Sequence, residues 1–191
     1  MNGILCINKP QEYTSFDVVA RIRGMSKTKR VGHSGTLDPM ATGVLPIFLG
    51  AATKACNLLP DDSKCYEAAF ALGKETDTLD CWGTIKKVRE AHVRIEEIQA
   101  ILPRFTGEIE QIPPMYSAVR INGQRLYDIA RQGKEVERPP RKVRITQLEC
   151  TAFNEKDQTG VLAVSCSKGT YIRSIINDIG TALGCGAVMT G

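Results

Sequence analysis

The chain has 191 residues, of which 42% are hydrophobic and 24% charged, and its formal net charge at pH 7 is +4. The length fits one domain, or one domain with a small insertion, and the composition is that of an ordinary soluble globular protein. The longest apolar runs, such as VLPIFLG, are too short to span a bilayer, and the N-terminus has no secretory signal pattern, so we expect a cytoplasmic protein with no membrane partner.

The N-terminal part of the chain predicts a strand, a helix, a long loop and a second strand. Thr14 or Ser15 is expected to cap the helix, with Asp17 favourable in its first turn. A loop rich in Gly, Ser, Thr and Lys follows at 25–42, and loops of that length inside a compact domain are usually functional or disordered. The expected strands lie at 3–8 and 44–49, and the helix ends near Gly24.

The rest of the chain mixes strands with inserted helices. A polar loop is expected at 73–83, and Pro103 is expected to end a helix. The other predicted elements are strands at 64–72, 84–88, 116–121, 143–153 and 160–167, helices at 94–102, 125–132 and 171–183, and a turn at Asn122-Gly123. Since strands come in adjacent runs, we expect an α+β fold with a mixed, mostly antiparallel central sheet and flanking helices.

Positive charge gathers in two segments. The first has Arg21, Arg23, Lys27, Lys29, Arg30 and His33 with no acid among them. The second has Arg131, Lys134, Arg138, Arg141, Lys142 and Arg144 with only Glu135 and Glu137. Such segments suit a phosphate backbone, and a solvated surface face is an equally good interpretation of either one alone.

The cysteines and histidines do not predict a metal site. The seven cysteines are odd in number, form no CxxC pair, and are expected to be mostly buried free thiols in a reducing compartment. The two histidines, His33 and His92, lie far from any cysteine cluster, so we expect no metal.

The loop GHSGTLDPMATGVLP at 32–46 carries the most information. Its glycines permit tight turns or the close approach of a ligand, and Pro39 directs Asp38 toward an extended conformation. Asp38 could therefore project its carboxylate into a cleft, or simply cap the following turn. Neither GxGxxG nor GxxxxGK[ST] occurs, so no nucleotide-binding loop is predicted.

Five ordered segments, which together span essentially the whole chain, resemble the TruB family, the tRNA pseudouridine-55 synthases. The GHSGTLDPMATGVLP loop is similar to the catalytic motif of that family along its whole length. The other segments are NKPQEYTS (8–15), KCYEAAFALGKETDTLDCWG (64–83), PPMYSAVRINGQRLYDIARQG (113–133) and SKGTYIRSIINDIGTALG (167–184). The resemblance implies the pseudouridine synthase fold and an isomerase that converts uridine 55 in the T-loop of tRNA to pseudouridine.

The resemblance also implies three catalytic residues. Asp38 would act at the ribose, either by attacking C1′ or by removing the C2′ proton to give a glycal, and both routes stay open. Arg173 would pair with the Asp38 carboxylate. Tyr66 would stack on the target base, and removal of the C5 proton is a second role for it, although a phenol with a pKa near 10 is a poor base.

The remaining site residues implied by the resemblance would bind the substrate. His33 would occupy space near the uridine once it has flipped out of the RNA stack, or make only local hydrogen bonds. Asp80 would bond to the base or organise its own turn, whereas Asp77 is expected to cap the turn. Lys9 would support the Asp38 loop or contact phosphate. The RNA backbone would be bound by basic residues, namely Arg21, Lys27, Lys29, Arg30, Arg131 and Arg141.

The reaction is a redox-neutral isomerisation, so no cofactor is expected, and we expect a monomer whose partner is the T stem-loop of tRNA. The chain departs from the family pattern at Glu12, where glycine is usual and the loop should bend differently, and at Trp82, which could pack on the RNA or on the core. Residues 1–191 would be the catalytic domain, and a C-terminal RNA-binding domain is expected in the full-length protein.

Two other classes of function are less consistent with the sequence. An RNA-binding protein with a lost active site is disfavoured because Asp38, Tyr66 and Arg173 are all present. A phosphate-binding or nucleotide-hydrolysing enzyme built on the glycine-rich loop lacks the Lys-Ser/Thr signature and a second acidic signature.

Overall fold

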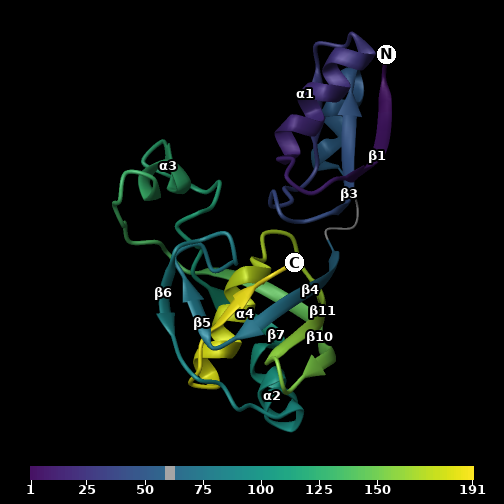
Figure 1. The fold of residues 1–191 in the computed structure, drawn as a ribbon. Helices are drawn as coiled ribbons and strands as arrows, with labels where there is room; N and C mark the ends of the chain where they lie inside the picture. The colour runs from purple at the N-terminus through teal and green to yellow at the C-terminus, as the bar shows by residue number, and fades with distance from the viewer. Residues whose placement is uncertain (59–62) are drawn as a thin grey trace. The chain divides into compact units, whose positions relative to one another are not determined.

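The chain forms two compact units, Met1–Asp62 and Ser63–Gly191, each of which is described by itself (Figure 1). The structure is a computed structural model, and it describes residues 1–58 and 63–191.

The first unit is a three-stranded antiparallel sheet with one long helix. The sheet order is β1-β3-β2, and Gly3 of β1 lies opposite Leu49 of β3. The elements are β1 (Gly3–Lys9), α1 (Ser15–Ser26), β2 (Val31–His33), β3 (Gly43–Leu49) and the 3-10 helix η1 (Gly50–Asn57).

The start of α1 is set by its own sequence. Thr14 is the N-cap: its hydroxyl accepts a hydrogen bond from the Asp17 backbone, and its own N–H donates to the Asp17 carboxylate at 2.8 Å. The Thr14 hydroxyl, which also donates to that carboxylate, lowers the pKa of Asp17. This capping box confirms the predicted helix start. One apolar face of α1 joins the sheet to make the core of this unit, with Val18, Val19, Val31, Leu45, Ile47 and Leu49 buried together.

The second unit is built on a five-stranded antiparallel sheet with the order β12-β4-β11-β10-β7. Two small hairpins, β5-β6 and β8-β9, stand beside it. The elements are β4 (Lys64–Leu72), β5 (Lys74–Thr76), β6 (Ile85–Val88), α2 (Ile95–Ile101), η2 (Leu102–Phe105), β7 (Gly107–Gln111), β8 (Arg120–Ile121), β9 (Gln124–Arg125), α3 (Leu126–Ala130), β10 (Arg141–Asn154), β11 (Thr159–Cys166), α4 (Ile172–Ala182) and β12 (Ala187–Met189).

Helix α4 lies across one face of this sheet and buries Ile175, Ile176 and Ile179 (Figure 1). Its close approach to β12 requires a glycine, because a Cβ on Gly180 would lie 2.3 Å from the backbone nitrogen of Ala187. The chain then reverses through Gly184 and Gly186, which both have positive φ.

The predicted fold class is confirmed, and several element predictions are corrected. The loop expected at 25–42 contains β2, and Pro103 continues into η2 instead of ending the helical segment. The strand expected at 116–121 shrinks to β8. Strands β7 and β12 were not predicted, because β7 has one apolar side chain, Ile109, in five residues and β12 has only three residues.

The cysteines are free thiols, as expected, but their burial was predicted wrongly. Cys166 and Cys185 are buried, whereas Cys6, Cys65 and Cys81 are exposed. Cys6 and Cys65 lie within β1 and β4, where successive side chains face opposite sides, so an apolar neighbourhood in the sequence does not determine burial.

Within the described residues, no group of His, Cys, Asp and Glu side chains has an arrangement that could hold a metal ion. In the same part of the chain, no helix combines the length and apolar character needed to cross a membrane.

The α4–β12 contact predicts that Gly180→Ala destabilises the protein by about 1–3 kcal/mol, since the added methyl must displace backbone. Gly24→Ala is the matched control: Gly24 is exposed within α1, and a Cβ there would meet nothing within 4 Å. We expect that control to stabilise the protein by about 0.4–1 kcal/mol. Denaturant unfolding measures both, and equal effects would contradict the packing argument.

Candidate functional site

The backbone of the residue that precedes Asp38 in its loop is held by a hydrogen bond. Ser15, the first residue of α1, is buried, and its hydroxyl accepts a hydrogen bond from the Leu37 N–H at 2.9 Å. The same hydroxyl lies 3.2 Å from the Leu37 carbonyl oxygen. The capped start of α1 therefore holds the peptide groups that immediately precede Asp38.

The side after Asp38 is held by β1 and the turn that follows it. Lys9 is 0% exposed, and its ammonium donates to the carbonyl oxygens of Pro10 at 2.9 Å, Tyr13 at 2.6 Å and Pro39 at 3.3 Å. Burial lowers the pKa of Lys9, and the negative charge of Asp38 acts in the opposite direction. Lys9 was expected either to support the Asp38 loop or to contact phosphate. These contacts agree with support of the loop.

Glu12 adds a second link to the same loop. Its N–H donates to the Pro39 carbonyl oxygen at 2.8 Å, and its φ is 69°, in the left-handed region that favours glycine. The turn thus keeps a conformation suited to glycine although the residue is glutamate.

His33, the last residue of β2, is partly buried and makes a local contact. Its Nδ1 donates to the Gly35 carbonyl oxygen, and its own carbonyl accepts from the Cys56 thiol at 3.4 Å. The first of these fixes the imidazole against the start of the Asp38 loop. The sequence allowed two roles for His33, local hydrogen bonding and contact with the substrate. The contact with Gly35 is a local hydrogen bond of the first kind.

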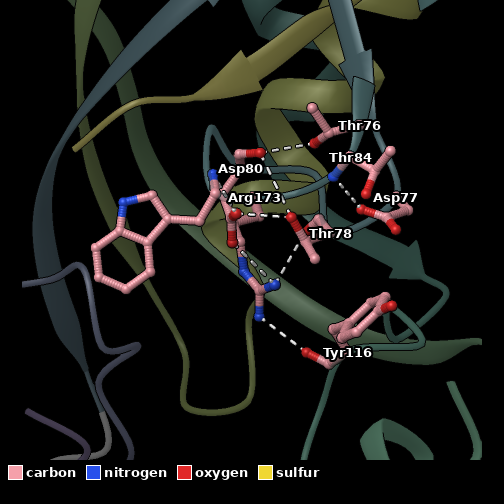
Figure 2. A network of polar contacts seen from close by, with 8 residues as sticks. Thr76, Asp77, Thr78, Asp80, Thr84, Tyr116 and Arg173 are labelled. Carbon is pink, nitrogen blue, oxygen red and sulfur yellow. Dashed lines mark hydrogen bonds and ion pairs between the residues drawn. The ribbon is translucent and has the colours of Figure 1, made fainter. Parts of the chain in front are cut away.

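In the second unit, Arg173 lies inside a polar network (Figure 2). It is 5% exposed, and its Nη1 donates to the Thr78 carbonyl oxygen at 2.9 Å, while its Nη2 donates to the Tyr116 carbonyl oxygen at 3.1 Å. Asp80 Oδ2 lies 3.5 Å from Arg173 Nη1. Arg173 is therefore a buried residue of α4 whose guanidinium is bonded within its own unit.

Asp80 both organises its own turn and faces Arg173. Its Oδ1 accepts from the Thr78 hydroxyl at 2.6 Å and from the Trp82 N–H at 3.1 Å. Asp77 Oδ1 accepts from the Thr84 N–H at 2.8 Å, which confirms the predicted turn cap (Figure 2). Trp82 is 53% exposed, so its packing in the core is excluded.

The helix that carries Arg173 is anchored at its first turn by a residue that the sequence did not single out. Gln111 of β7 is 3% exposed, and its amide donates to the Tyr171 carbonyl oxygen at 3.0 Å and accepts from the Tyr171 N–H at 2.8 Å. This reciprocal pair fixes the backbone two residues before Arg173. A buried glutamine at the end of a strand is the signal that could have pointed to it.

The other predicted site residues are each described within their own element. Tyr66 is a partly buried residue of β4, opposite Val164 of β11. Arg30, Arg131 and Arg141 are exposed. Next to α3, the guanidinium of Arg131 lies 5.3 Å from the centre of the Tyr127 ring, and that of Arg125 lies 5.6 Å from it, which gathers two cations on one aromatic ring.

The sequence did not identify the residues that hold the site together. Ser15 was considered only as a helix cap, and Thr78 and the Tyr116 carbonyl were not considered. No local pattern marks these contacts, because each joins segments far apart in the chain.

Comparison with known proteins shows the family. The family described as TruB family pseudouridylate synthase (N terminal domain) matches residues 23–172. The chain belongs to the TruB family of pseudouridylate synthases.

Individual relatives agree with this. The chain is 51% identical over 191 residues to a tRNA pseudouridine synthase B of Alkaliphilus oremlandii, and 49% identical over 187 residues to one of Pseudomonas fluorescens. It covers 63% and 61% of the lengths of these relatives, which is less than two thirds, while 100% and 98% of the chain is matched.

Solved structures share the fold. A chain in the crystal structure of a Cbf5-Nop10-Gar1 complex is similar with a TM-score of 0.74 and 32% identity, over 98% of this chain and 46% of that one. A chain in the structure of an H/ACA RNP bound to a substrate RNA containing 2′-deoxyuridine gives a TM-score of 0.70 and 29% identity, over 98% of this chain and 44% of that one.

The anchoring of Leu37 predicts the effect of Ser15→Ala. The variant leaves the Leu37 N–H without its partner, so we expect a loss of about 1–3 kcal/mol of stability and faster amide exchange at Leu37. Ser34→Ala is the control, because the Ser34 hydroxyl has no hydrogen-bond partner among residues 1–58 and 63–191. Unchanged exchange at Leu37 in Ser15→Ala would show that the loop is held by other contacts.

Proposed function

We propose that this chain is the catalytic part of a tRNA pseudouridine synthase, which isomerises uridine 55 of the T-loop to pseudouridine after flipping that base out of the RNA. Family membership supports the reaction class. The observation that carries the proposal is the immobilised backbone around Asp38 within the motif GHSGTLDPMATG. The chain covers under two thirds of its relatives, so the activity and substrate of the whole protein are part of this proposal.

The reaction needs a carboxylate at the ribose. The N1–C1′ bond breaks, a C5–C1′ bond forms, the C5 proton leaves, and N1 takes up a proton, so atoms and electrons balance without a co-reactant. Positive character develops at C1′ when the first bond breaks, and a nearby carboxylate stabilises it. Asp38 would supply that carboxylate, either by attacking C1′ or by removing the C2′ proton.

The setting of Asp38 suits this role. Catalysis gains most from groups that are held in place before the substrate arrives, because their ordering then costs nothing during the reaction. Ser15 holds the peptide before Asp38, and Lys9 and Glu12 hold the carbonyl after it. A residue that merely capped a surface turn would not need a fully buried lysine to support it.

Arg173 would pair with Asp38 and keep it ionised. A planar guanidinium can hold a carboxylate through two parallel hydrogen bonds, and an ionised carboxylate in a closed site needs a compensating charge. We therefore assign Asp38 to Arg173 as a carboxylate partner in the active enzyme. Tyr66 would stack on the flipped base, and His33 would contact the flipped nucleotide.

RNA would be bound mainly through its phosphates and shape. Arg30, Arg131 and Arg141 are exposed, which fits a role in holding the backbone of the T stem-loop without reading its sequence. We place the protein in the cytoplasm as a monomer, and the free thiols of the described cysteines fit a reducing compartment. A further C-terminal RNA-binding domain of the whole protein belongs to the same proposal.

Tritium release from T stem-loop RNA labelled at uridine C5 tests the function. We expect the wild type to release the label and Asp38→Asn to release at least about a thousandfold less, because the neutral amide cannot act at the ribose. Binding of the RNA should stay within about threefold, since the two side chains have the same shape. Equal release by both proteins, or no release by the folded wild type, would refute the proposal.

Two arginine variants separate catalysis from RNA binding. We expect Arg173→Lys to lower kcat by about a hundredfold with little change in Kd, because lysine keeps the charge but loses the planar fork.

Arg131→Ala should do the opposite: kcat stays, Kd rises, and the slope of log K against log salt falls by about 1, as for one phosphate contact. Fluorescence titration at several salt concentrations and single-turnover kinetics measure both. A pure binding defect in Arg173→Lys would contradict the pairing role.

A further inference from the structure

The turn between β5 and β6 presents the only tryptophan of the chain to solvent. Trp82 lies in this turn, and its side chain is 53% exposed. Single exposed apolar residues are common on protein surfaces and do not by themselves indicate a binding site. Trp82 differs from them in how its backbone is held and in which groups surround it.

The backbone around Trp82 is held on both sides. The Trp82 N–H donates to Asp80 Oδ1 at 3.1 Å, and the Cys81 N–H donates to the Met189 carbonyl oxygen at 2.8 Å. On the other side, the Gly83 N–H donates to the Asp80 carbonyl oxygen at 3.3 Å. Because this backbone is already ordered, a ligand that contacts the indole has only two side-chain torsions to immobilise.

Trp82 lies beside the Arg173 network. Asp80, which accepts from the Trp82 N–H through Oδ1, forms an ion pair through Oδ2 with Arg173 Nη1 at 3.5 Å. Two residues of extended chain span at most about 7 Å, so the Cα of Trp82 lies within about that distance of the Cα of Asp80. The exposed indole is therefore next to the residues of this unit that we assign to the active site.

The exposed charges of the same hairpin favour a polyanion. Glu75 pairs with Arg89, and the Asp77 carboxylate accepts a hydrogen bond from the Thr84 N–H at 2.8 Å. The exposed side chains of β5 and β6 include three ammonium groups, those of Lys74, Lys86 and Lys87. Exposed cations beside an exposed aromatic ring are suited to unpaired nucleotides, because the cations attract phosphates and the ring stacks on a base.

We infer that the indole of Trp82 stacks on an unpaired base of the RNA substrate close to the flipped uridine, and so adds affinity for the RNA. The inference rests on the proposed function, which brings the T stem-loop to the site beside Arg173. Every base has a flat face, so this contact requires no particular base. The chain departs from the family pattern at Trp82, so the contact is additional to those that the family motifs imply.

Tryptophan fluorescence tests the contact directly in the unmodified protein, because Trp82 is the only tryptophan. We expect acrylamide to quench the emission of the free protein, since the side chain is exposed. Titration with T stem-loop RNA should quench the emission by about half or more, and the bound RNA should protect the remaining emission from acrylamide.

Variants measure what the contact contributes to affinity, by fluorescence anisotropy of a labelled T stem-loop. We expect Trp82→Ala to raise Kd about tenfold or more, and the loss should appear in Kd and not in the single-turnover rate at saturating RNA. Trp82→Phe, which keeps an aromatic face, should bind within about threefold of the wild type, whereas the aliphatic Trp82→Leu should not. Val88→Ala is the control: Val88 is 65% exposed at the other end of β6, and its Kd should stay unchanged.

Several outcomes would overturn the inference. Emission that does not change when RNA binds, or equal Kd in Trp82→Ala and Val88→Ala, would show that no base stacks on the indole. An indole shielded from acrylamide in the free protein would show that protein covers it. Failure of the proposed function is distinguishable, because the wild type would then release no tritium, whereas tritium release without quenching overturns this inference alone.

Discussion

The burial of the Arg173 guanidinium is the constraint on which the second unit depends. A charge that is only 5% exposed is costly to leave without acceptors, so segments far apart in the chain must supply them. The turn between β5 and β6 brings the Thr78 carbonyl and Asp80, the segment after β7 brings the Tyr116 carbonyl, and Gln111 holds the start of α4. The contacts of Thr78 and Tyr116 tie two loop segments to Arg173, and Gln111 fixes the start of the helix that carries it.

In the first unit, the corresponding feature is the set of contacts that hold the Asp38 loop in place. This unit uses backbone contacts on both sides of Asp38 and places the buried ammonium of Lys9 on carbonyl oxygens. Burial lowers the pKa of Lys9, and the negative charge of Asp38 acts in the opposite direction. Glu12 keeps a left-handed backbone within this arrangement, which shows that the contact with Pro39 outweighs the usual preference of such a position for glycine.

The sequence predicted those helices and strands that are determined by residues close together in the chain. The capping box of Thr14 and Asp17 gave the start of α1, and β4 was predicted with its observed bounds because its alternation is strong. Strand β2 was missed, since its three residues sit among polar neighbours and depend on pairing with β3. Asp38 and Arg173 could be selected from family motifs, but the Ser15–Leu37 and Thr78–Arg173 contacts could not, because hydrogen bonds between distant segments leave no periodic pattern.

Our central proposal is that the Arg173 guanidinium, which bonds to acceptors within its own unit, also pairs with the Asp38 carboxylate in the active enzyme. The most direct measurement is a crystal structure of the protein bound to a T stem-loop RNA that carries pseudouridine, the proposed product. We predict that Arg173 is bonded to the Asp38 carboxylate and that Asp38 lies against the ribose of the flipped nucleotide. A structure in which Asp38 lies away from that ribose, or in which Asp38 does not contact Arg173, would contradict the proposal.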